Sequence, residues 1–399
     1  MSEWKKIRLG DVIESVSKTF KFKEEKVYFL NTSDTLEGKV LNHNLFDPKD
    51  LPGQAKKTFQ KRDILYSEIR PENKRFAFID FDSSKYVAST KLMVLRPKED
   101  CQILPEFLFQ FLTSQETIAY LQIQAESRSG TFPQIRFDEI SHLEINLPPL
   151  PTQKAIAEIL SSLDDKIELN NQINQNLEAL AQALFKQWFV DFEFPNENGE
   201  PYKSSGGEMA DSELGEIPKG WGISKFEELV KISTGKGIKK SDYNPNGLFP
   251  VIGANGVMGF FDNYNIEGFN ILTGRVGTLG TIRISIEKAW TSDNVLIIEP
   301  KEMNLNHFVF FTMNSFDFNA LNRGSTQPLI TQGDLKSITC FNPDDQTLNF
   351  FQNQMDYLLN LKEEFKTEIK SLSDLRDTLL PKLISGEFEV NESLLEPTF

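Results

Sequence analysis

The side chains that most often carry out catalysis are few in this chain, and they are not spaced as catalytic sets. Three histidines and two cysteines, Cys101 and Cys340, are scattered over 399 residues. Neither a zinc-binding spacing nor a nucleophile–base set can be assembled from them. The neighbouring acids Asp164 and Asp165 fall on the polar face of a predicted helix, where we expect no basic partner. We therefore predict no catalytic and no metal site in this chain.

Three short motifs lie near known ligand-binding patterns but lack the residues that those patterns require. Phe341-Asn-Pro-Asp lacks the Asn-Pro-Pro-Tyr composition of an adenine pocket, and Ser233-Thr-Gly-Lys-Gly237 fails as a Gly-rich cofactor turn. Gly235-Lys-Gly-Ile-Lys-Lys240 lacks the spacing of a phosphate-binding loop. We predict that the chain binds no cofactor of its own.

Composition indicates a globular protein of more than one domain. The chain is 39% hydrophobic and has a net charge of −15, and its length allows two domains with separate cores. Residues 1–150 carry equal numbers of basic and acidic side chains, so most of the acidity lies in later stretches. Two distant cysteines favour a reducing, cytoplasmic compartment. We expect neither a signal peptide nor a membrane span.

Two long helices are predicted by heptad periodicity. In the first, Thr152 is a plausible N-cap, and Pro195 is the first residue after it that would end the helix. About 38 helical residues would extend roughly 57 Å, longer than most helices inside small domains. Asn170 and Asn174 fall at buried positions, where an amide fixes register. The first set of heptad positions is Ile156, Leu160, Leu163, Ile167, Asn170, Asn174, Leu177, Ala181, Leu184 and Trp188; the second is Phe351, Met355, Leu358, Phe365, Ile369, Leu372, Leu379 and Leu383.

The two halves of the chain repeat one order of elements. Arg323–Ile330 follows Arg128–Ile135 at an offset of 195 residues, and Trp221–Leu229 resembles Trp4–Val12. The heptad leucines also correspond at 195. This predicts a tandem duplication of a globular block followed by a long helix.

The connectivity predicts an α+β fold with two related globular α/β domains separated by two long helices. Each helix would pair with the other as an antiparallel coiled coil, because neither can bury its apolar face alone. The expected arrangement is pseudo-two-fold. Two related domains at a set spacing suit a two-part ligand, and on duplex DNA equivalent sites recur about every 34–36 Å.

The sequence resembles a known family, the specificity subunits of type I restriction–modification systems. The resemblance covers essentially the whole chain, and its motifs are specific only in combination. One departure is Asn342–Gln346, where the second helix begins less typically than the first. The motifs are Leu147-Pro-Pro-Leu-Pro-Thr-Gln153, Leu184-Phe-Lys-Gln-Trp-Phe-Val-Asp-Phe192, Leu214-Gly-Glu-Ile-Pro-Lys-Gly-Trp221, Ile252-Gly-Ala-Asn-Gly256, Arg323-Gly-Ser-Thr-Gln327 and Lys382-Leu-Ile-Ser-Gly-Glu387.

The resemblance implies a non-catalytic DNA-binding subunit with two target recognition domains. Such subunits bind a gapped, bipartite DNA sequence and recruit two modification subunits, which methylate adenine, and motor-nuclease subunits for restriction. S-adenosylmethionine and ATP with Mg²⁺ are expected on those partners. The implied domains are 1–147 (first recognition domain), 148–194 (first spacer helix), 195–218 (linker), 219–343 (second recognition domain), 344–390 (second spacer helix) and 391–399 (tail).

Candidate DNA contacts are cationic and polar residues of the two globular blocks. Arginine and lysine suit phosphates and guanine edges, and amides suit adenine. Ordinary surface lysines, or arginines that pair internally, remain the alternative. The first block offers Lys56, Lys57, Lys61, Arg70, Lys74, Arg75 and Arg128; the second offers Lys236, Lys239, Lys240, Tyr243, Asn255, Arg275, Arg283, Arg323 and Thr326.

The aromatic end of the first helix has two interpretations. Phe185, Trp188, Phe189 and Phe192 exceed what the heptad pattern needs. Internal packing is the simpler interpretation, and a dock for a modification subunit is the second. A bidomain protein-binding scaffold is the alternative function for the chain as a whole, and it predicts no salt-sensitive affinity for DNA.

Overall fold

The computed structural model describes the chain as two compact units, each with its own core. One unit is Met1–Asn170 together with Thr367–Phe399, and the other is Asn171–Lys366. No helix within the described part of the chain is long and apolar enough to cross a membrane. The described residues are 4–23, 25–127, 133–276, 280–318, 320–321 and 329–390.

The first unit is built on two small sheets and a pair of terminal strands. The first sheet has the order β2-β11-β8-β9 and is antiparallel throughout. The second has the order β6-β3-β10-β7, with β3 and β10 parallel. β1 pairs with β12, and β4 with β5. The strands are β1 (Lys5–Arg8), β2 (Ile13–Ser15), β3 (Val27–Leu30), β4 (Thr35–Leu36), β5 (Lys39–Val40), β6 (Leu45–Phe46), β7 (Ala55–Lys57), β8 (Ile64–Ser67), β9 (Phe76–Phe78), β10 (Tyr86–Ser89), β11 (Leu92–Pro97) and β12 (Glu144–Leu147).

Short helices cover the β2-β11-β8-β9 sheet of this unit. The sequence predicts a single helical stretch from Pro105 to Leu121, but the structure divides it in two. Ser114 separates the two helices, because its hydroxyl accepts from the Thr117 amide and so caps the second one. The helices are α1 (Leu9–Val12), α2 (Pro105–Leu112), α3 (Gln115–Ser127) and α4 (Phe137–Ser141).

The second unit repeats this topology with different strand lengths. Its main sheet has the order β16-β22-β19-β20, its smaller sheet β18-β17-β21, and β15 pairs with β23. Again one pair in the smaller sheet, β17 with β21, is parallel. The strands are β15 (Gly222–Lys225), β16 (Val230–Thr234), β17 (Phe249–Gly253), β18 (Gly256–Phe261), β19 (Asn270–Gly274), β20 (Ile282–Ser285), β21 (Trp290–Thr291), β22 (Val295–Pro300) and β23 (Thr339–Asn342); the helices are α6 (Phe226–Leu229), α7 (Asn306–Asn314) and α8 (Gln332–Lys336).

Backbone hydrogen bonds confirm the predicted duplication at the level of single residues. The Ile135 amide donates to the Glu68 carbonyl at 2.8 Å, and the Ile330 amide donates to the Arg275 carbonyl at 2.9 Å. Ile135 and Ile330 lie 195 residues apart, as do the starts of the two long helices. Glu68 and Arg275 therefore occupy the same place in the two units, although their charges are opposite.

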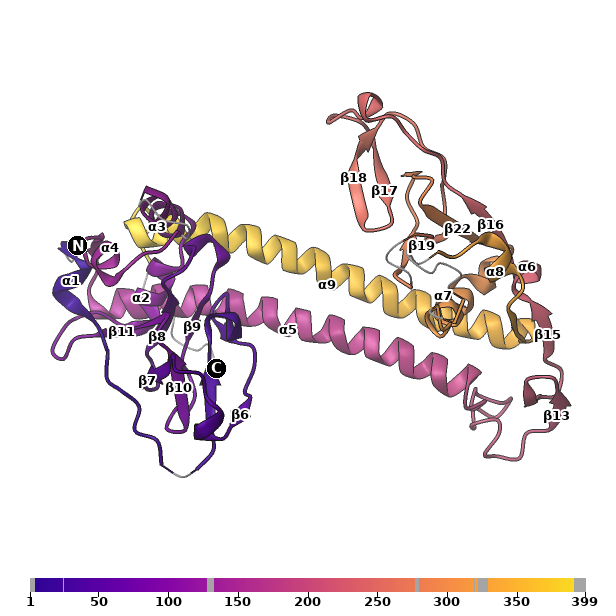
Figure 1. The fold of residues 1–399 in the computed structure, drawn as a ribbon, viewed down its shortest axis with the longest axis horizontal. Helices are drawn as coiled ribbons and strands as arrows, with labels where there is room; N and C mark the ends of the chain where they lie inside the picture. Colours follow the sequence, from indigo (N-terminus) through magenta and orange to yellow (C-terminus); the bar gives the residue numbers. More distant parts are fainter. Residues whose placement is uncertain are drawn as a thin grey trace. The chain divides into compact units, whose positions relative to one another are not determined.

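The two long helices, α5 (Leu150–Phe189) and α9 (Asp345–Ser385), pair antiparallel inside each unit (Figure 1). In the first unit Asp164 contacts Arg376 and Asn170 contacts Glu368. In the second unit Lys362 contacts Glu178, and further along the same pair Trp188 packs on Phe351. Residue numbers rise on one helix as they fall on the other, as the coiled-coil prediction requires.

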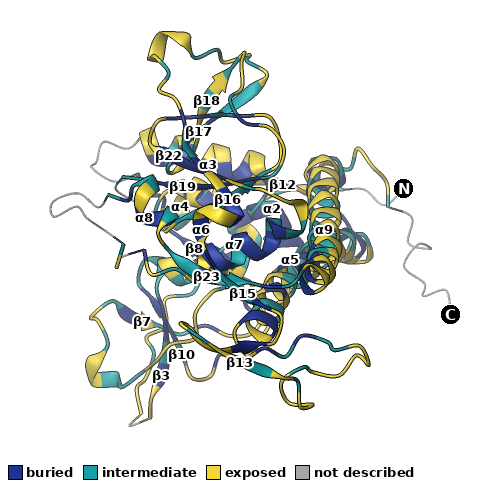
Figure 2. Cartoon of the chain, turned by 90° about the vertical axis from the view of Figure 1, so that its right-hand side faces the viewer, coloured by how far each residue is buried: buried dark blue, intermediate teal, exposed yellow. Residues whose placement is uncertain are grey.

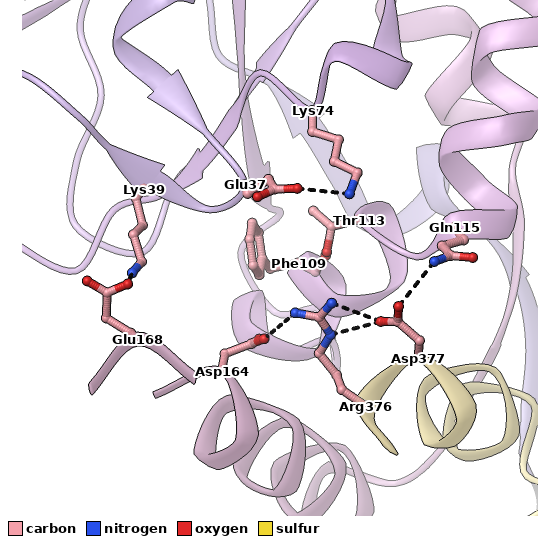
Figure 3. A network of polar contacts seen from close by, with 10 residues as sticks. All are labelled: Glu37, Lys39, Lys74, Phe109, Thr113, Gln115, Asp164, Glu168, Arg376 and Asp377. Atoms are coloured by element: carbon pink, nitrogen blue, oxygen red, sulfur yellow. Dashed lines mark hydrogen bonds and ion pairs between the residues drawn. The ribbon is translucent and has the colours of Figure 1, made fainter. Parts of the chain in front are cut away.

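Asp164 corrects one sequence-based expectation. We expected no basic partner for this acid, but its carboxylate accepts from Arg376 Nη1 at 2.9 Å. Arg376 also donates to Asp377, and the Gln115 side chain of α3 donates to the same Asp377 carboxylate (Figure 3). The expectation was wrong because the partner lies 212 residues away and is brought close only by the helix pairing.

The predicted N-cap of the first long helix is also wrong. The helix begins at Leu150, two residues before Thr152. Gln153 in its first turn is fully buried, donates to the carbonyls of Gln102 and Pro148, and accepts from the Leu104 amide at 2.8 Å. A side chain inside the core, rather than a cap, therefore holds the start of this helix in place.

The segment predicted as a linker, 195–218, is folded. It contains β13 (Met209–Ser212) and β14 (Gly215–Pro218), which pair antiparallel. Tyr202 stacks on Phe194 with ring centroids 4.6 Å apart, and Ile217 is buried in the core of the second unit. These residues extend the core of the second unit.

Both asparagines at the heptad positions are buried, as predicted. Asn170 donates from Nδ2 to Glu368 at 2.8 Å. The Oδ1 atoms of Asn170 and Asn174 are buried and accept no hydrogen bond from the described residues. Buried amides of this kind disfavour other registers of the helix pair more than they stabilise this one.

Candidate nucleic-acid interface

The β17–β18 hairpin of the second unit exposes several apolar side chains. Its turn is Ala254-Asn255, and Asn255-Gly256 between apolar residues is a strong hairpin signal. The exposed fractions on the outer strand are 63% for Val257, 52% for Met258 and 43% for Phe260. Figure 2 shows the hairpin coloured mostly as exposed or intermediate.

A lysine-containing segment, 235–243, is fixed beside this hairpin by its backbone. The Lys236 amide donates to the Thr291 carbonyl, and the Trp290 indole Nε1 donates to the Lys236 carbonyl, both at 2.9 Å. A β-carbon at Gly235 would lie 2.2 Å from the Ser292 carbonyl oxygen, so only glycine fits there. The segment therefore presents Lys236, an exposed residue, from a backbone held against β21 and β22.

The hairpin and this segment enclose a groove of about 660 Å³. Its lining includes Ile238, Lys240, Tyr243, Met258 and Phe260. It combines apolar side chains, two aromatic rings and one cation.

Gly259 in β18 fixes the position of Tyr243 in that groove. A β-carbon at Gly259 would lie 2.6 Å from the Tyr243 ring, so glycine allows the ring to lie directly against the strand. The amide of the next residue, Asn244, donates to the Phe260 carbonyl at 2.9 Å. The ring is therefore positioned by backbone contacts and does not depend on a ligand.

The two described arginines of this unit occupy different surroundings. Arg283 on β20 lies with Nη1 3.4 Å from where a β-carbon on Gly256 would be, next to the hairpin turn. Arg275 follows β19, and its buried Nε has no hydrogen-bond partner within the described structure. The structure thus brings Lys240, Tyr243, Asn255 and Arg283 around the hairpin, whereas Arg275 lies next to β22, its amide donating to the Asn294 carbonyl.

Six of the predicted DNA-contacting cations lie in the described part of the first unit, and three of them already have partners within the protein. Lys57 donates to the Leu92 carbonyl at 2.8 Å, and burial lowers the pKa of its ammonium; Glu68 opposes that shift and Lys91 adds to it. Lys74 pairs with Glu37 at 2.8 Å.

The other cations of this unit differ in exposure. Arg75 donates to the carbonyls of Ser33 and Thr35, both at 3.2 Å. Lys56, Lys61 and Arg70 are exposed, and they are the residues of the predicted set that can contact DNA without losing an internal bond.

Two ion pairs connect residues 70–75 to the first long helix through the loop at residues 37–39. Lys74 pairs with Glu37, and Lys39, two residues later, pairs with Glu168 of α5 (Figure 3). A β-carbon on Gly38, which has φ +96°, would lie 3.1 Å from the Phe109 ring, so the loop packs tightly on α2. Residues 70–75 are thus held on the same unit as the N-terminal part of α5.

Three predicted DNA contacts, Arg128, Arg323 and Thr326, lie outside the described residues. All three stay predictions. The backbone on the C-terminal side of both turns is described: Gln134 bridges to Ile69 and Leu329 bridges to Val276. Gln134 and Leu329 therefore lie beside the residues next to Arg70 and Arg275, respectively.

The aromatic end of the first long helix packs inside the second unit. Trp188, Phe189 and Phe192 are buried, and Phe185 packs against the same core. Phe189 lies 4.8 Å from Phe308 and 4.9 Å from Phe351, measured between ring centroids. The docking prediction assumed an exposed apolar surplus, and these contacts remove that premise for the buried rings.

A metal site needs several acidic, thiol or imidazole side chains clustered together. Within the described part of the chain, no group of three or more His, Cys, Asp or Glu side chains could hold a metal ion. His307 is buried and bonds to Asp356 at 2.8 Å, beside the Phe269 ring. Its position in the core of α7 indicates a structural role.

Sequence reasoning missed the apolar face of the hairpin, although a signal was present. Asn255-Gly256 followed by Val257, Met258 and Phe260 has the composition of a hairpin with an exposed strand. Gln153 gave no such signal, because a single glutamine in a helix does not show which backbone groups it will meet.

The chain is similar to known proteins along nearly its whole length. Residues 1–179 and 218–371 match the type I restriction modification DNA specificity domain. The chain is 34% identical over 460 residues to the type I restriction enzyme HindI specificity subunit of Haemophilus influenzae, covering 97% of this chain and 100% of that protein. It is 26% identical to the MjaIX specificity subunit of Methanocaldococcus jannaschii, over 73% of this chain and 70% of that one.

A solved structure has a similar fold. The type I restriction–modification S subunit from M. genitalium superimposes with a TM-score of 0.62 at 17% identity, covering 98% of this chain and 97% of that chain. The two chains therefore share one fold over nearly their whole length.

Proposed function

This chain belongs to the type I restriction–modification DNA specificity family, and we propose that, as the non-catalytic specificity subunit of such a system, it binds a gapped DNA site through two recognition domains. Each domain would contact one half-site, residues 1–147 the first and residues 219–343 the second. The gap would be set by the paired helices, 148–194 and 344–390. A protein-binding scaffold, the alternative function, is not favoured by this family membership.

One observation carries the proposal. The family match falls on both repeats, and the two repeats share backbone topology while differing in the side chains next to their equivalent turns. Glu68 and Arg275 are the plainest example, because the same backbone bonds hold residues of opposite charge. Such a pair of domains suits two half-sites of different sequence.

The partners follow from the family as proposals. We infer that the chain recruits two modification subunits, which bind S-adenosylmethionine and methylate adenine. Motor-nuclease subunits, which bind ATP and Mg²⁺, would join for restriction. The cytoplasm is the proposed location, because the two cysteines, Cys101 and Cys340, are free thiols.

Methylation-sensitive sequencing of DNA from the source cell tests the proposal directly. Deleting the gene is expected to remove one gapped adenine-methylation motif, and restoring the gene is expected to return it. An unchanged set of methylated motifs would refute the specificity role. A binding assay on the assembled complex adds a second test, because phosphate contacts predict an affinity for DNA that falls steeply with salt.

A further inference from the structure

The β17–β18 hairpin has a form that the first unit lacks. Its strands are joined by a two-residue turn, and β17 also pairs with β21 at Val251 and Ile252, which leaves β18 as the free edge of this small sheet. In the first unit the corresponding pair, β3 and β6, is two residues long and is separated by Asn31–Asn44. Among the described residues, only the second unit has a hairpin with a two-residue turn at this place in the fold.

We propose that this hairpin enters the DNA major groove at one half-site and discriminates base pairs there, Asn255 at an adenine edge and Met258 and Phe260 at thymine methyl groups. The inference rests on the proposed function and specifies which element of the second domain selects bases. The major groove, about 12 Å wide, admits a two-stranded β-ribbon. A side-chain amide pairs with the N6 and N7 atoms of adenine, and apolar side chains contact the thymine methyl.

Exposure and register place the required side chains together. Met258 and Phe260 both line the groove beside Tyr243. Met258 is the extra residue of β18 where the hairpin register shifts, between the Val251–Gly259 and Ile252–Val257 pairs. Asn255 is exposed at the turn, the part of the ribbon that would reach deepest. An exposed apolar strand on a soluble surface costs solubility, and base contact would account for it.

Charge around the hairpin favours DNA as its occupant. Lys236, Lys239 and Lys240 are exposed on the segment that borders the groove, where they would meet phosphates at its edges. Arg283 lies against Gly256 beside the turn. Three acids lie nearby: Asp262 follows β18 and accepts hydrogen bonds from Asn244, Asp242 belongs to the lysine-containing segment, and Asp293 lies beside Gly237.

The hairpin is also held rigid before any ligand binds. Phe261 packs edge-on against Trp290 with centroids 5.1 Å apart, and the Ser292 amide donates to the Ile252 carbonyl at 2.9 Å. A recognition element that is already ordered does not have to be ordered on binding, which favours discrimination between closely similar sites.

The experiment compares two methionine truncations in the same unit. Met258→Ala removes a side chain of the hairpin, and Met303→Ala removes one that is 82% exposed elsewhere in the unit. Asn255→Ala is the second hairpin variant. Each is assembled with its modification subunits, and duplexes in which every base pair of the methylated motif is replaced in turn compete for binding.

For Met258→Ala and Asn255→Ala, we expect the preference for the correct base pair over its replacements to fall about tenfold at one or more positions of one half-site. The preferences at the other half-site should be unchanged. Met303→Ala should retain all discrimination. Sequencing of methylated DNA should show the same relaxed position in cells. Since all three side chains are exposed, thermal unfolding should be unchanged.

Three results would overturn the inference. One is discrimination equal to that of Met303→Ala, and another is a uniform loss of affinity for all sequences, which would indicate contact with the DNA backbone only. The third is weaker assembly with modification subunits at unchanged discrimination, which would indicate a protein-binding hairpin. If the unaltered complex methylates no gapped motif at all, the proposed function itself fails. If it methylates a gapped motif and the hairpin variants discriminate bases as well as it does, only the role of the hairpin is refuted.

Discussion

The two units begin their long helices at equivalent residues but stabilise those starts with different chemistry. In the first unit the buried Gln153 side chain joins three backbone groups. In the second, the equivalent position is the buried apolar Leu348, and Asp344 instead accepts from the Thr347 amide and the Trp221 indole. The difference shows that the repeat preserves backbone geometry and leaves each unit free to satisfy it with its own side chains.

The largest expected effect comes from removing the Gln153 contacts. Gln153→Leu keeps the size of the side chain but leaves the Leu104 amide and the carbonyls of Gln102 and Pro148 without their partner. We expect the first unit to lose about 3 kcal/mol of stability. Urea unfolding with hydrogen exchange at α2 measures it, and Gln60→Leu, at an exposed glutamine of the same unit, is the control. Equal stability of the two variants would contradict the role of Gln153.

Asp344→Ala tests the corresponding start in the second unit. The Asp344 carboxylate accepts from the Thr347 amide and hydroxyl, both at 2.8 Å, and from Trp221 Nε1 at 2.9 Å. We expect a loss of about 2 kcal/mol, smaller than for Gln153 because this site is only partly buried. Hydrogen exchange in the first turn of α9 reports the change. Asp345→Ala should cost clearly less, and an equal cost would argue for a general charge effect at the helix terminus.

The ion pairs between the long helices allow a direct comparison of the two units. Asp164 pairs with Arg376 in one, and Glu178 with Lys362 in the other. These side chains are partly exposed, so we expect a coupling energy of about 0.5–1 kcal/mol in each double-mutant cycle. Coupling that stays constant at high salt would contradict a screened, surface-like pair.

A pH titration should affect the second unit through His307. Burial lowers the pKa of this imidazole below its ordinary value of 6.5, and the hydrogen bond and charge of Asp356 oppose that shift only in part. The unfolded chain therefore takes up the proton more readily than the folded one. The contribution to stability is complete above pH 6.5 and is lost as pH falls through the lower, folded pKa.

The measurement for His307 is the unfolding free energy of the second unit between pH 7.5 and 5. His307→Phe should flatten this dependence. A variant with the same pH profile as the unaltered chain would show that other groups cause it. The hydrogen bond and charge of Asp356 oppose the effect of burial on the pKa of His307, which reduces this pH dependence.

Periodicity and internal repetition were sufficient to predict the main features of the fold. The heptad positions of α5 and α9 follow from local apolar patterns, and the offset of 195 residues follows from the internal repeat. The pairing of Asp164 with Arg376 does not, because it depends on the register of two helices that are remote in sequence. Gln153 escaped prediction for the same reason, since its backbone partners at Gln102 and Leu104 come from another element.

The candidate interface was predicted by residue type and only in part by position. Lys57, Lys74 and Arg75 resembled free surface cations, but a carbonyl or carboxylate within reach occupies each of them. Those partners belong to residues 33–37 and to Leu92, and no local sequence pattern shows that they lie next to these cations. Around β17–β18, in contrast, Lys240, Tyr243 and Asn255 are near in sequence, so their grouping could be anticipated, whereas Arg283 comes from β20.

The division of the chain into units bears on how it is synthesised. The second unit, Asn171–Lys366, is one uninterrupted stretch, whereas the first needs Thr367 onward. Leu380 and Leu383 of α9 belong to the same core as Ile156 and Leu160 of α5. On the ribosome, the half of the protein encoded first must therefore wait for the last residues to emerge, and its exposed apolar helix face is the segment most in need of a chaperone during that delay.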